Sequence, residues 1–375
     1  MSRFLIACGG TGGHLSPGIS LAEGLMARGH AVTLVISRKK VDARLIEKYP
    51  DLRFERMPGT GFSWSPVKLA RCFASQARAV GFCLRLLRRA RPDVVVSFGG
   101  FTGVPVVAAA RLARIPVALH EANRVPGLAV RTLAIVATRV YLPFGIRLRG
   151  VSAAVIRHIG LPVRREIVRL PRAEARSALG LEPNHKVLAV LGGSQGAATL
   201  NEWTRDHVTV LAGEGVQVYC VTGLDKGAPE VLELKTKGGA PVRAIFTPFC
   251  DRMAELLSAA DLVLSRAGAG TLAELIRCET PAVLVPYPHA ANDHQRPNAR
   301  FFERQGGGLV VDQEELAGLQ AEVLDVIFND WLLRAFCGNL RRMDRANSLE
   351  VMLRDLEEIA GSEEAGLKLQ PQVGI

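Results

Sequence analysis

The sequence lacks the features that mark several large classes of protein. None of its apolar runs approaches the length of a membrane-spanning helix, and Met1 to Arg3 lead directly into a strand-like segment rather than a signal peptide. Its seven cysteines are scattered without a C-x-x-C pair, which argues against a zinc site or a disulfide framework and fits a reducing cytoplasm. These absences indicate a soluble globular protein, and a length of 375 residues favours two domains.

Acidic residues are scarce in the first half of the chain. Residues 1–163 contain 24 lysines and arginines against 7 aspartates and glutamates, whereas the remaining residues contain 23 against 29. A basic domain joined to an acidic one indicates an anionic partner for the first domain. Aromatic residues make up only 6% of the chain, and no DNA-binding or stacking motif accompanies the basic charge, so an anionic membrane surface is favoured over nucleic acid.

Three common nucleotide and metal motifs are also missing. No G-x-x-x-x-G-K-[ST] sequence is present, which excludes a P-loop NTPase on motif grounds, and no D-x-D sequence is present to hold a divalent metal ion. The dinucleotide fingerprint fails, because in register from Gly10 its last glycine position is Leu15 and basic residues follow the second expected strand. We therefore expect neither a bound metal nor a cofactor, and a nicotinamide oxidoreductase is a distant alternative.

Two glycine-rich loops are present instead, and each follows an apolar strand. The first, Gly9 to His14, is expected to precede a helix that Ser16 caps and that contains Pro17 in its first turn. The second, Gly192 to Gly196, precedes a helix from Ala197. The repeated strand–loop–helix unit predicts an α/β protein with two doubly wound, Rossmann-like domains.

The expected domains meet in a proline- and arginine-containing linker. We expect an N-terminal domain over residues 1–163, a C-terminal domain over residues 164–344, and a last helix, about residues 345–362, that packs back on the first domain. Apolar segments predict the strands of both sheets: Phe4–Cys8, Val32–Ile36, Asp93–Ser97, Pro116–Leu119, Val187–Leu191, Val216–Val221, Val242–Phe246, Asp261–Leu264, Ala282–Val285 and Gly308–Val311.

The segment Arg266 to Glu274 combines glycines with the expected start of a helix. Glycine allows backbone N–H groups to approach a ligand closely, and a helix N-terminus favours an anion such as a phosphate. Glu274 lies about one turn into that helix, where its carboxylate could accept hydrogen bonds from both ribose hydroxyls. An ordinary strand–turn–helix corner has the same sequence pattern, so this segment alone does not decide between the two interpretations.

Polar residues follow another expected strand, and a basic helix precedes it. His120, Glu121 and Asn123 come directly after Pro116–Leu119, where side chains line the cleft of an open α/β sheet and could transfer protons or bind sugar hydroxyls. Val67 to Ala90 predicts a helix with an apolar stripe and many arginines. Such a helix either packs on the core with a solvated basic face or docks on an anionic membrane.

Taken in order, these motifs resemble the MurG family of N-acetylglucosaminyltransferases. The resemblance rests on Gly9–His14, His120–Asn123, Gly192–Ala197, Arg266–Glu274 and Asp293–Gln295, and it extends to about residue 350. It implies the GT-B architecture of glycosyltransferase family 28, two Rossmann-like domains with the active-site cleft between them. It also implies an inverting transfer of GlcNAc from UDP-GlcNAc to the C4 hydroxyl of MurNAc in undecaprenyl-pyrophosphoryl-MurNAc-pentapeptide (lipid I).

The resemblance further implies a role for individual residues. His14 and Glu121 are the candidate acid–base residues, and the choice between them stays open. Glu274 would bind the ribose, and the backbone of Cys250 would contact the uracil beside Arg164. The remaining residues expected around UDP-GlcNAc are Thr11, Gly12, Gly13, Asn123, Ser194, Ala269, Gly270, Thr271, Leu272, His294 and Gln295. Backbone N–H groups near Ser194 and Gly268–Thr271 would stabilise the UDP leaving group.

The implied setting is peptidoglycan synthesis, and with it cell shape and division, at the cytoplasmic face of the inner membrane. The sequence departs from the family at Leu161, where an asparagine is usual before the proline, at Ala122, where glutamine is common, and at His294, where some members carry a second glutamine. A GT-B enzyme with another acceptor and a non-catalytic nucleotide-sugar binding protein remain alternatives. Loops 58–66 and 98–103 would distinguish the first alternative, and a turnover assay the second.

Overall fold

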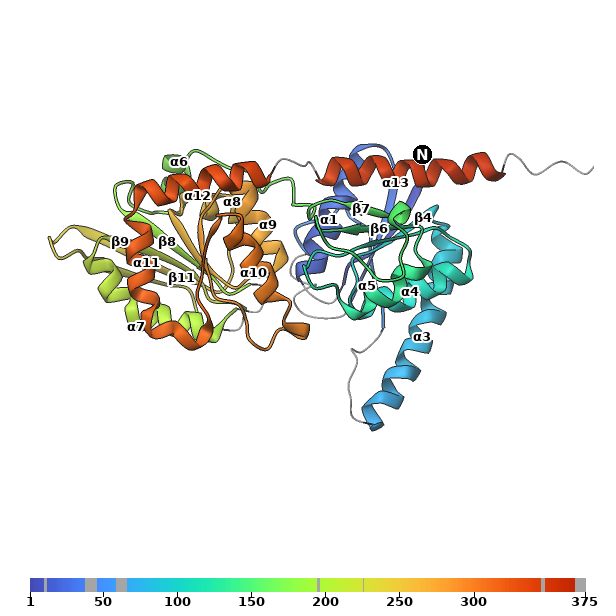
Figure 1. Cartoon of the computed structure of the whole chain (residues 1–375), viewed down its shortest axis with the longest axis horizontal. Coiled ribbons are helices and arrows are strands. Elements are labelled where there is room, and N and C mark those ends of the chain that lie inside the picture. Colours follow the sequence, from blue (N-terminus) through green and yellow to red (C-terminus); the bar gives the residue numbers. More distant parts are fainter. Residues whose placement is uncertain are drawn as a thin grey trace, which may run out of the picture. The chain divides into compact units, whose positions relative to one another are not determined.

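The structure is a computed structural model of the whole chain, and it describes residues 1–9, 12–37, 46–58, 66–193, 196–224, 226–344 and 348–367 (Figure 1). Side chains are described for the same residues except 12, 66–74 and 362–367. The chain divides into two compact units, of which the first comprises Met1–Arg164 and Asn347–Ile375 and the second comprises Arg165–Ala346. Among the described residues, no helix is both long enough and apolar enough to cross a membrane.

The first unit is built on a parallel sheet with the order β3-β2-β1-β4-β5-β6-β7. Its strands are β1 (Arg3–Ala7), β2 (Ala31–Ile36), β3 (Phe54–Arg56), β4 (Val94–Ser97), β5 (Val117–His120), β6 (Arg139–Leu142) and β7 (Ile156–His158). The direction in which strands are added reverses between β1 and β4, and ligands of doubly wound sheets bind at the carboxyl ends of strands at such a point.

Helices cover both faces of this sheet because alternate strand residues are apolar on both sides. They are α1 (Gly12–Ala27), α3 (Pro66–Ala90), α4 (Gly100–Leu112), α5 (Leu128–Leu133) and α13 (Ser348–Leu367), with the 3₁₀ turns η1 (Ala134–Val136) and η2 (Ala153–Val155). Phe4 and Ile6 point into a core with α1 and α13, whereas Leu5 and Ala7 point into a core with α3 and α4.

The last helix is part of the first unit. Met352, Leu353 and Leu356 of α13 are buried in the same cluster as the α1 side chains, so the two helices are in contact. Arg28 of α1 also forms ion pairs with Glu350, at 2.5 Å, and with Glu357, at 2.6 Å. The C-terminal segment therefore completes a core that begins at residue 4.

The second unit has a sheet of the same design with one antiparallel edge. The order is β10-β11-β9-β8-β12-β13-β14, and among the strands that the structure describes in this unit only the β10–β11 pair is antiparallel. The strands are β8 (Lys186–Leu191), β9 (Val216–Val221), β10 (Glu230–Lys235), β11 (Pro241–Thr247), β12 (Leu262–Ser265), β13 (Ala282–Leu284) and β14 (Gly308–Val310). Its switch point lies between β8 and β12.

The helices of the second unit enclose a separate core. They are α6 (Arg172–Ala178), α7 (Ala198–Gly213), α8 (Met253–Ala259), α9 (Ala269–Cys278), α10 (Gln295–Arg304), α11 (Leu319–Ile327) and α12 (Asp330–Met343), with the 3₁₀ turns η3 (Ala291–Asp293) and η4 (Gln313–Gly318). Leu188, Val190 and Leu264 are fully buried among side chains of α7 and α11. The fold class expected from the sequence, two doubly wound domains, is confirmed.

The structure corrects several local expectations. The first helix begins at Gly12, so Ser16 and Pro17 lie inside it rather than at its cap and first turn. Among the described side chains of α3, those of Ala79, Cys83, Leu86 and Leu87 are buried. The sequence predicted an apolar stripe that includes Ala77, Val80, Leu84 and Leu87; of these Leu87 is buried, Val80 and Leu84 are half-buried, and Ala77 is exposed. The expected loop residues Phe62 and Trp64 lie outside the described residues. Strands β3, β6, β7 and β10 were not predicted.

Candidate active site

A helix N-terminus lies at the switch point of the second sheet. The turn after β12 brings Gly268 to the N-cap position of α9, and its extended backbone lets the helix begin at Ala269. The N–H groups of Ala269, Gly270 and Thr271 belong to the first turn, which offers no acceptor within the helix. Leu272 differs, because its N–H donates to the Gly268 carbonyl at 3.0 Å and its side chain is buried.

The glycine loop after β8 approaches the neighbouring backbone closely. A Cβ on Gly192 would lie 2.1 Å from the Ala197 nitrogen, and a Cβ on Gly196 would lie 2.1 Å from the Thr222 carbonyl oxygen. Gly193 and Gly196 also have positive φ angles of 76° and 67°. Glycine is therefore required here for both space and backbone conformation. Ser194, expected to contact the diphosphate, lies outside the described residues.

Two side chains of α10 and the side chain of Arg266 in the turn itself hold the turn that precedes α9. The Gln295 amide oxygen, at the start of α10, accepts hydrogen bonds from the Ala267 N–H at 3.2 Å and the Tyr287 N–H at 3.0 Å. The buried Asn298 amide donates to the Ala267 carbonyl at 3.2 Å. The buried Arg266 guanidinium donates to the Val285 carbonyl at 3.0 Å and to the Gln313 amide oxygen at 2.6 Å. Burial lowers the pKa of this guanidinium.

Gln295, a predicted site residue, thus lies at the α9 turn, whereas no role was predicted for Asn298 and Arg266. Arg266 opens one of the predicted motifs and Asn298 lies shortly after another, but their function depends on hydrogen bonds to atoms 19 to 47 residues away. No spacing in the sequence reveals such a bond.

Three of the other residues expected at the donor site, Glu274, Cys250 and His294, also belong to the second unit, whereas Arg164 does not. Glu274 is half-buried in the second turn of α9. Cys250 is buried between β11 and α8, and burial raises the pKa of its thiol. His294 directs its Nδ1 to the Ala291 carbonyl oxygen, at 2.8 Å, within its own loop. Arg164 is the last residue of the first unit.

In the first unit, His14 lies where the ends of β1 and β4 meet. It sits in the first turn of α1, and a Cβ on Gly100 would lie 3.1 Å from both Cε1 and Nδ1 of its ring. Gly99 and Gly100 have positive φ angles of 85° and 69°, so this close approach depends on glycine. Thr102 donates to the Gly9 carbonyl at 2.9 Å and ties the two strand ends together. Gly12 and Gly13 share the first turn with His14, while Thr11 lies outside the described residues.

The Glu121 carboxylate is engaged by its own loop. One oxygen accepts from the backbone and side-chain N–H groups of Asn123, at 2.9 and 3.0 Å, and the other accepts from the Gly127 N–H at 2.7 Å. Glu121 is only 6% exposed. These bonds fix the orientation of Asn123 and the start of α5, a structural role that was not predicted from the sequence.

His120, the last residue of β5, is buried, with 1% of its surface exposed. Its Nε2 lies 3.3 Å from the Gly160 carbonyl oxygen, and its Nδ1 has no hydrogen-bond partner among the described residues. Burial is the main reason that its pKa falls to about 4, and the neighbouring His14 lowers it further. The imidazole is therefore neutral at physiological pH.

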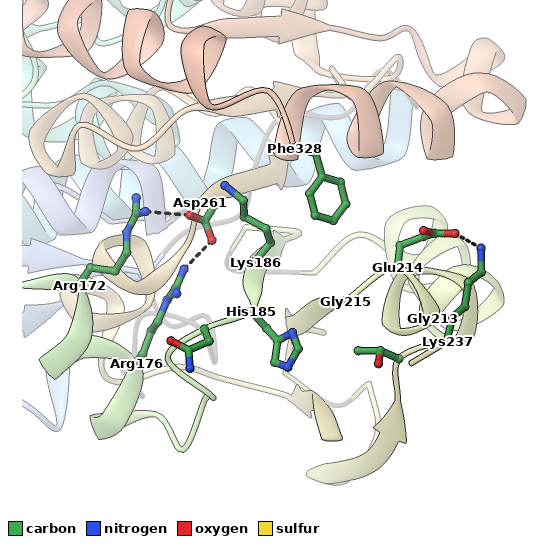
Figure 2. Close-up of a pocket in the computed structure, with 12 residues that line it drawn as sticks. Arg172, Arg176, His185, Lys186, Gly213, Glu214, Gly215, Lys237, Asp261 and Phe328 are labelled. Atoms are coloured by element: carbon green, nitrogen blue, oxygen red, sulfur yellow. Dashed lines mark hydrogen bonds and ion pairs between the residues drawn. The ribbon is translucent and has the colours of Figure 1, made fainter. Parts of the chain in front are cut away.

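A cavity of about 610 Å³ lies at the amino ends of the strands of the second sheet, opposite the carboxyl ends at which the switch-point ligands of such sheets bind (Figure 2). It is lined by Lys186 at the start of β8 and by Gly215 and Asp261 just before β9 and β12, and by none of the predicted site residues. Figure 2 shows Arg172 and Arg176 converging on the Asp261 carboxylate, at 2.8 and 2.6 Å. These ion pairs join α6 to the sheet, and they leave neither arginine free to bind a charged ligand in the cavity.

Comparisons with known proteins agree with this geometry. Models of the glycosyltransferase family 28 N-terminal and C-terminal domains match residues 4–142 and 187–333. A curated relative from Opitutus terrae, named UDP-N-acetylglucosamine–N-acetylmuramyl-(pentapeptide) pyrophosphoryl-undecaprenol N-acetylglucosamine transferase, is 63% identical over 96% of this chain and 95% of its own. A relative of the same name from Desulforudis audaxviator is 35% identical over 96% of this chain and 99% of its own.

Solved structures share the fold. The crystal structure of Acinetobacter baumannii MurG superposes with a TM-score of 0.70 at 24% identity, covering 95% of this chain and 99% of that one. The calicheamicin glycosyltransferase CalG4 gives a TM-score of 0.64 at 17% identity, covering 96% and 98%. With two family models matched in order and near-complete coverage of its relatives, this chain belongs to glycosyltransferase family 28 and is a hexosyltransferase of the GT-B fold.

Proposed function

We propose that this enzyme transfers GlcNAc from UDP-GlcNAc to the C4 hydroxyl of MurNAc in undecaprenyl-pyrophosphoryl-MurNAc-pentapeptide, with inversion at the anomeric carbon. The observation that carries the proposal is the 63% identity, over 96% of the chain, to a curated relative whose name states this reaction. The product would be the disaccharide lipid used in peptidoglycan synthesis.

The second unit would bind the donor. The first-turn N–H groups of Ala269, Gly270 and Thr271 would receive the diphosphate, where the helix dipole favours the charge that develops on UDP as it leaves. Glu274 would accept hydrogen bonds from the ribose hydroxyls, and the backbone near Cys250 would contact the uracil, with Arg164 and Ser194 as further donor contacts. Gln295 and His294 would bind the sugar hydroxyls.

The first unit would supply the acceptor side and the base. We assign proton removal from the C4 hydroxyl to His14, on the glycine-lined corner of β1 and β4. Support comes from the contrast with Glu121, both of whose carboxylate oxygens already accept N–H hydrogen bonds from its own loop. Glu121 would instead orient Asn123 toward the sugar. A correctly placed general base contributes roughly 10²–10⁴-fold to the rate.

The lipid acceptor requires the enzyme to work at a membrane surface. We propose a peripheral location on the cytoplasmic face of the inner membrane, with α3 as the docking element and no nucleic-acid partner. Arg78, Arg85 and Arg88 are exposed on α3, and in Figure 1 the N-terminal end of this helix projects from its own unit. Exposed arginines on a helix whose N-terminal end projects from its unit suit an anionic lipid surface.

Transfer of labelled GlcNAc to a lipid I analogue tests the proposal directly. The assay would compare the wild type with Glu274→Ala and with the control Glu202→Ala, an exposed carboxylate on α7. Losing two hydrogen bonds to a charged group should lower kcat/KM for UDP-GlcNAc about 100-fold. The control should match the wild type. Because no carboxylate-held metal is expected, activity should persist in EDTA.

Other outcomes would contradict particular parts of the proposal. A wild-type enzyme that binds UDP-GlcNAc but leaves the lipid I analogue unmodified, with or without Mg²⁺, would have a different acceptor or no catalytic function. If Glu274→Ala behaved like Glu202→Ala, the donor site would be misplaced. A His14→Gln variant that kept wild-type kcat would remove His14 as the base.

A further inference from the structure

A hydrogen bond joins two segments of the first unit that lie next to the points at which the chain leaves that unit and returns to it. The first passage follows Arg164, and α13 begins directly after the second. Near the first, the Gly160 N–H donates to the Ser348 hydroxyl at 2.9 Å. A Cβ on Gly160 would lie only 2.6 Å from that oxygen, so the contact depends on glycine. Ser348 therefore fixes the position of the peptide at Gly160.

The same glycine contacts the buried histidine at the end of β5. Its carbonyl oxygen accepts from His120 Nε2 at 3.3 Å, and a carbonyl can only accept, so Nε2 carries the proton. In the neutral ring the Nδ1 atom then keeps its lone pair, which has no partner among the described residues. The tautomer of His120 is thus set from Gly160.

A second contact from α13 supports the same region. Asp355, two turns after Ser348, accepts from the Tyr141 hydroxyl and from Arg139 Nε, both at 2.7 Å. The Tyr141 ring lies with its centroid 6.4 Å from that of His120. Helix α13 therefore makes hydrogen bonds both to β6, beside His120, and to the peptide of Gly160, which bonds to His120.

The segment Phe98–Gly100, at the end of β4, contacts both His14 and His120. The Phe98 ring lies with its centroid 5.2 Å from that of His120, and Gly100, two residues later, packs against the ring of His14. The titratable groups that face His120 are His14 from α1 and Tyr141 from β6, and Asp355 of α13 lies behind Tyr141. Glu121, the next residue, directs its carboxylate into its own loop.

We propose that His120 is a positioning residue for His14, and that Ser348 and Gly160 hold it in place. In the reacting complex Nδ1 of His120 accepts an N–H from the His14 imidazole, which leaves the other His14 nitrogen to take the proton from the acceptor hydroxyl. The proton moves from that hydroxyl to His14 as the new glycosidic bond forms and UDP leaves. This inference rests on the proposed function, because it assigns His14 the role of base.

The test uses the full-length enzyme and compares Ser348→Ala, His120→Gln and His120→Leu with the control Ile359→Val. Ile359 is a buried residue of α13 outside this chain of contacts, and its variant loses one methyl group. Steady-state transfer is measured from pH 5 to 9 with each substrate varied, and thermal unfolding is recorded for every variant.

Ser348→Ala should lower kcat about tenfold, the effect of losing one well-placed hydrogen bond, and leave KM for UDP-GlcNAc unchanged. The acid limb of its kcat–pH profile should move to lower pH, because the displaced Nδ1 lone pair of His120 no longer stabilises protonated His14. His120→Leu should show a larger loss. His120→Gln should recover part of it, since an amide N–H can still donate to Gly160. Ile359→Val should keep the wild-type kcat and pH profile.

Two results would overturn the inference. One is a Ser348→Ala variant with a wild-type kcat and acid limb, and the other is a loss of activity that follows only the fall in unfolding temperature across all four variants. His14→Gln separates this failure from that of the proposed function. If His14→Gln is inactive while Ser348→Ala and His120→Gln are unaffected, His14 remains the base and only the positioning role is lost.

Discussion

At the scale of single residues, His120 and Glu121 illustrate how neighbouring positions acquire different roles. They are adjacent at the end of β5, yet the imidazole of His120 is buried against aromatic rings and one carbonyl, whereas the Glu121 carboxylate accepts N–H groups from a turn. The position after a buried strand, visible in the sequence, predicted that both would matter. The sequence could not distinguish their roles, because these depend on tertiary contacts: the Gly160 carbonyl bonds to His120, and the Gly127 N–H bonds to Glu121.

The buried His120 should make stability pH-dependent. Its pKa is lowered from 6.5 to about 4, chiefly by burial, so between these values the unfolded chain binds a proton that the folded chain does not. Stability from this residue is therefore complete above pH 6.5 and is lost as the pH falls toward 4. Between pH 7.5 and pH 5 the loss should be about 2 kcal/mol.

Urea unfolding at these two pH values measures the loss. His120→Gln removes the titrating group, so its free energy of unfolding should fall less than that of the wild type by about 2 kcal/mol. The exposed His158→Gln should follow the wild type. Equal losses in all three proteins would rule out His120 as the source of the acid sensitivity.

At the scale of elements, the long parallel strands were the most predictable part of the molecule. Apart from their first residues, strands such as β1 and β8 are continuous apolar runs because helices cover both of their faces. Short strands such as β3, with three half-exposed or exposed residues, have no such signal and form only because β2 provides a partner. The N-terminus of α1 was misplaced for a related reason, since Ser16 and Pro17 normally mark a helix start. Here the glycine turn after β1 starts the helix one turn earlier.

Helix α3 supplies a prediction about membranes. Replacing Arg78, Arg85 and Arg88 with Gln should weaken binding to vesicles that contain anionic lipid by about 3 kcal/mol, or about 100-fold, because each basic residue near the surface contributes about 1 kcal/mol. Co-sedimentation with vesicles at low salt measures the change. The inward face of α3, Ala79, Cys83 and Leu86, is untouched, so the fold should be retained.

The matched control removes the same charge from the second unit, as Lys237→Gln, Arg304→Gln and Arg334→Gln. These three residues are exposed, so their replacement should leave the fold intact. Each triple variant loses three positive charges, so the two have equal net charge. If both variants lost vesicle binding to the same extent, overall charge rather than α3 would direct the enzyme to the membrane.

At the scale of the whole molecule, the repeated glycine loop made the two-domain fold predictable from the sequence. Each loop follows a strand at a switch point, β1 beside β4 and β8 beside β12, and the same physical requirement for close backbone approach places glycine at both. The remaining part of the site was not predictable in the same way. Arg266, Asn298 and Ser348 act through hydrogen bonds to atoms that are distant in the sequence, which leave no periodic pattern in it.

The two units have separate hydrophobic cores, so a core mutation and a ligand should act on different units. Leu356 of α13 is fully buried in the core of the first unit, and Leu356→Ala should destabilise that unit by about 2–5 kcal/mol. Amide hydrogen exchange should then accelerate in β1 and β4 but not in β8 and β12. Leu200→Ala, in the core of the second unit, is the matched control and should produce the reverse pattern. UDP-GlcNAc at 100 times its Kd should raise the free energy of opening of the second unit by about 2.7 kcal/mol and so slow exchange in β8 and β12. If Leu356→Ala accelerated exchange in all four strands equally, the chain would unfold as one cooperative unit, and α13 would stabilise the donor half as much as the half whose core it completes.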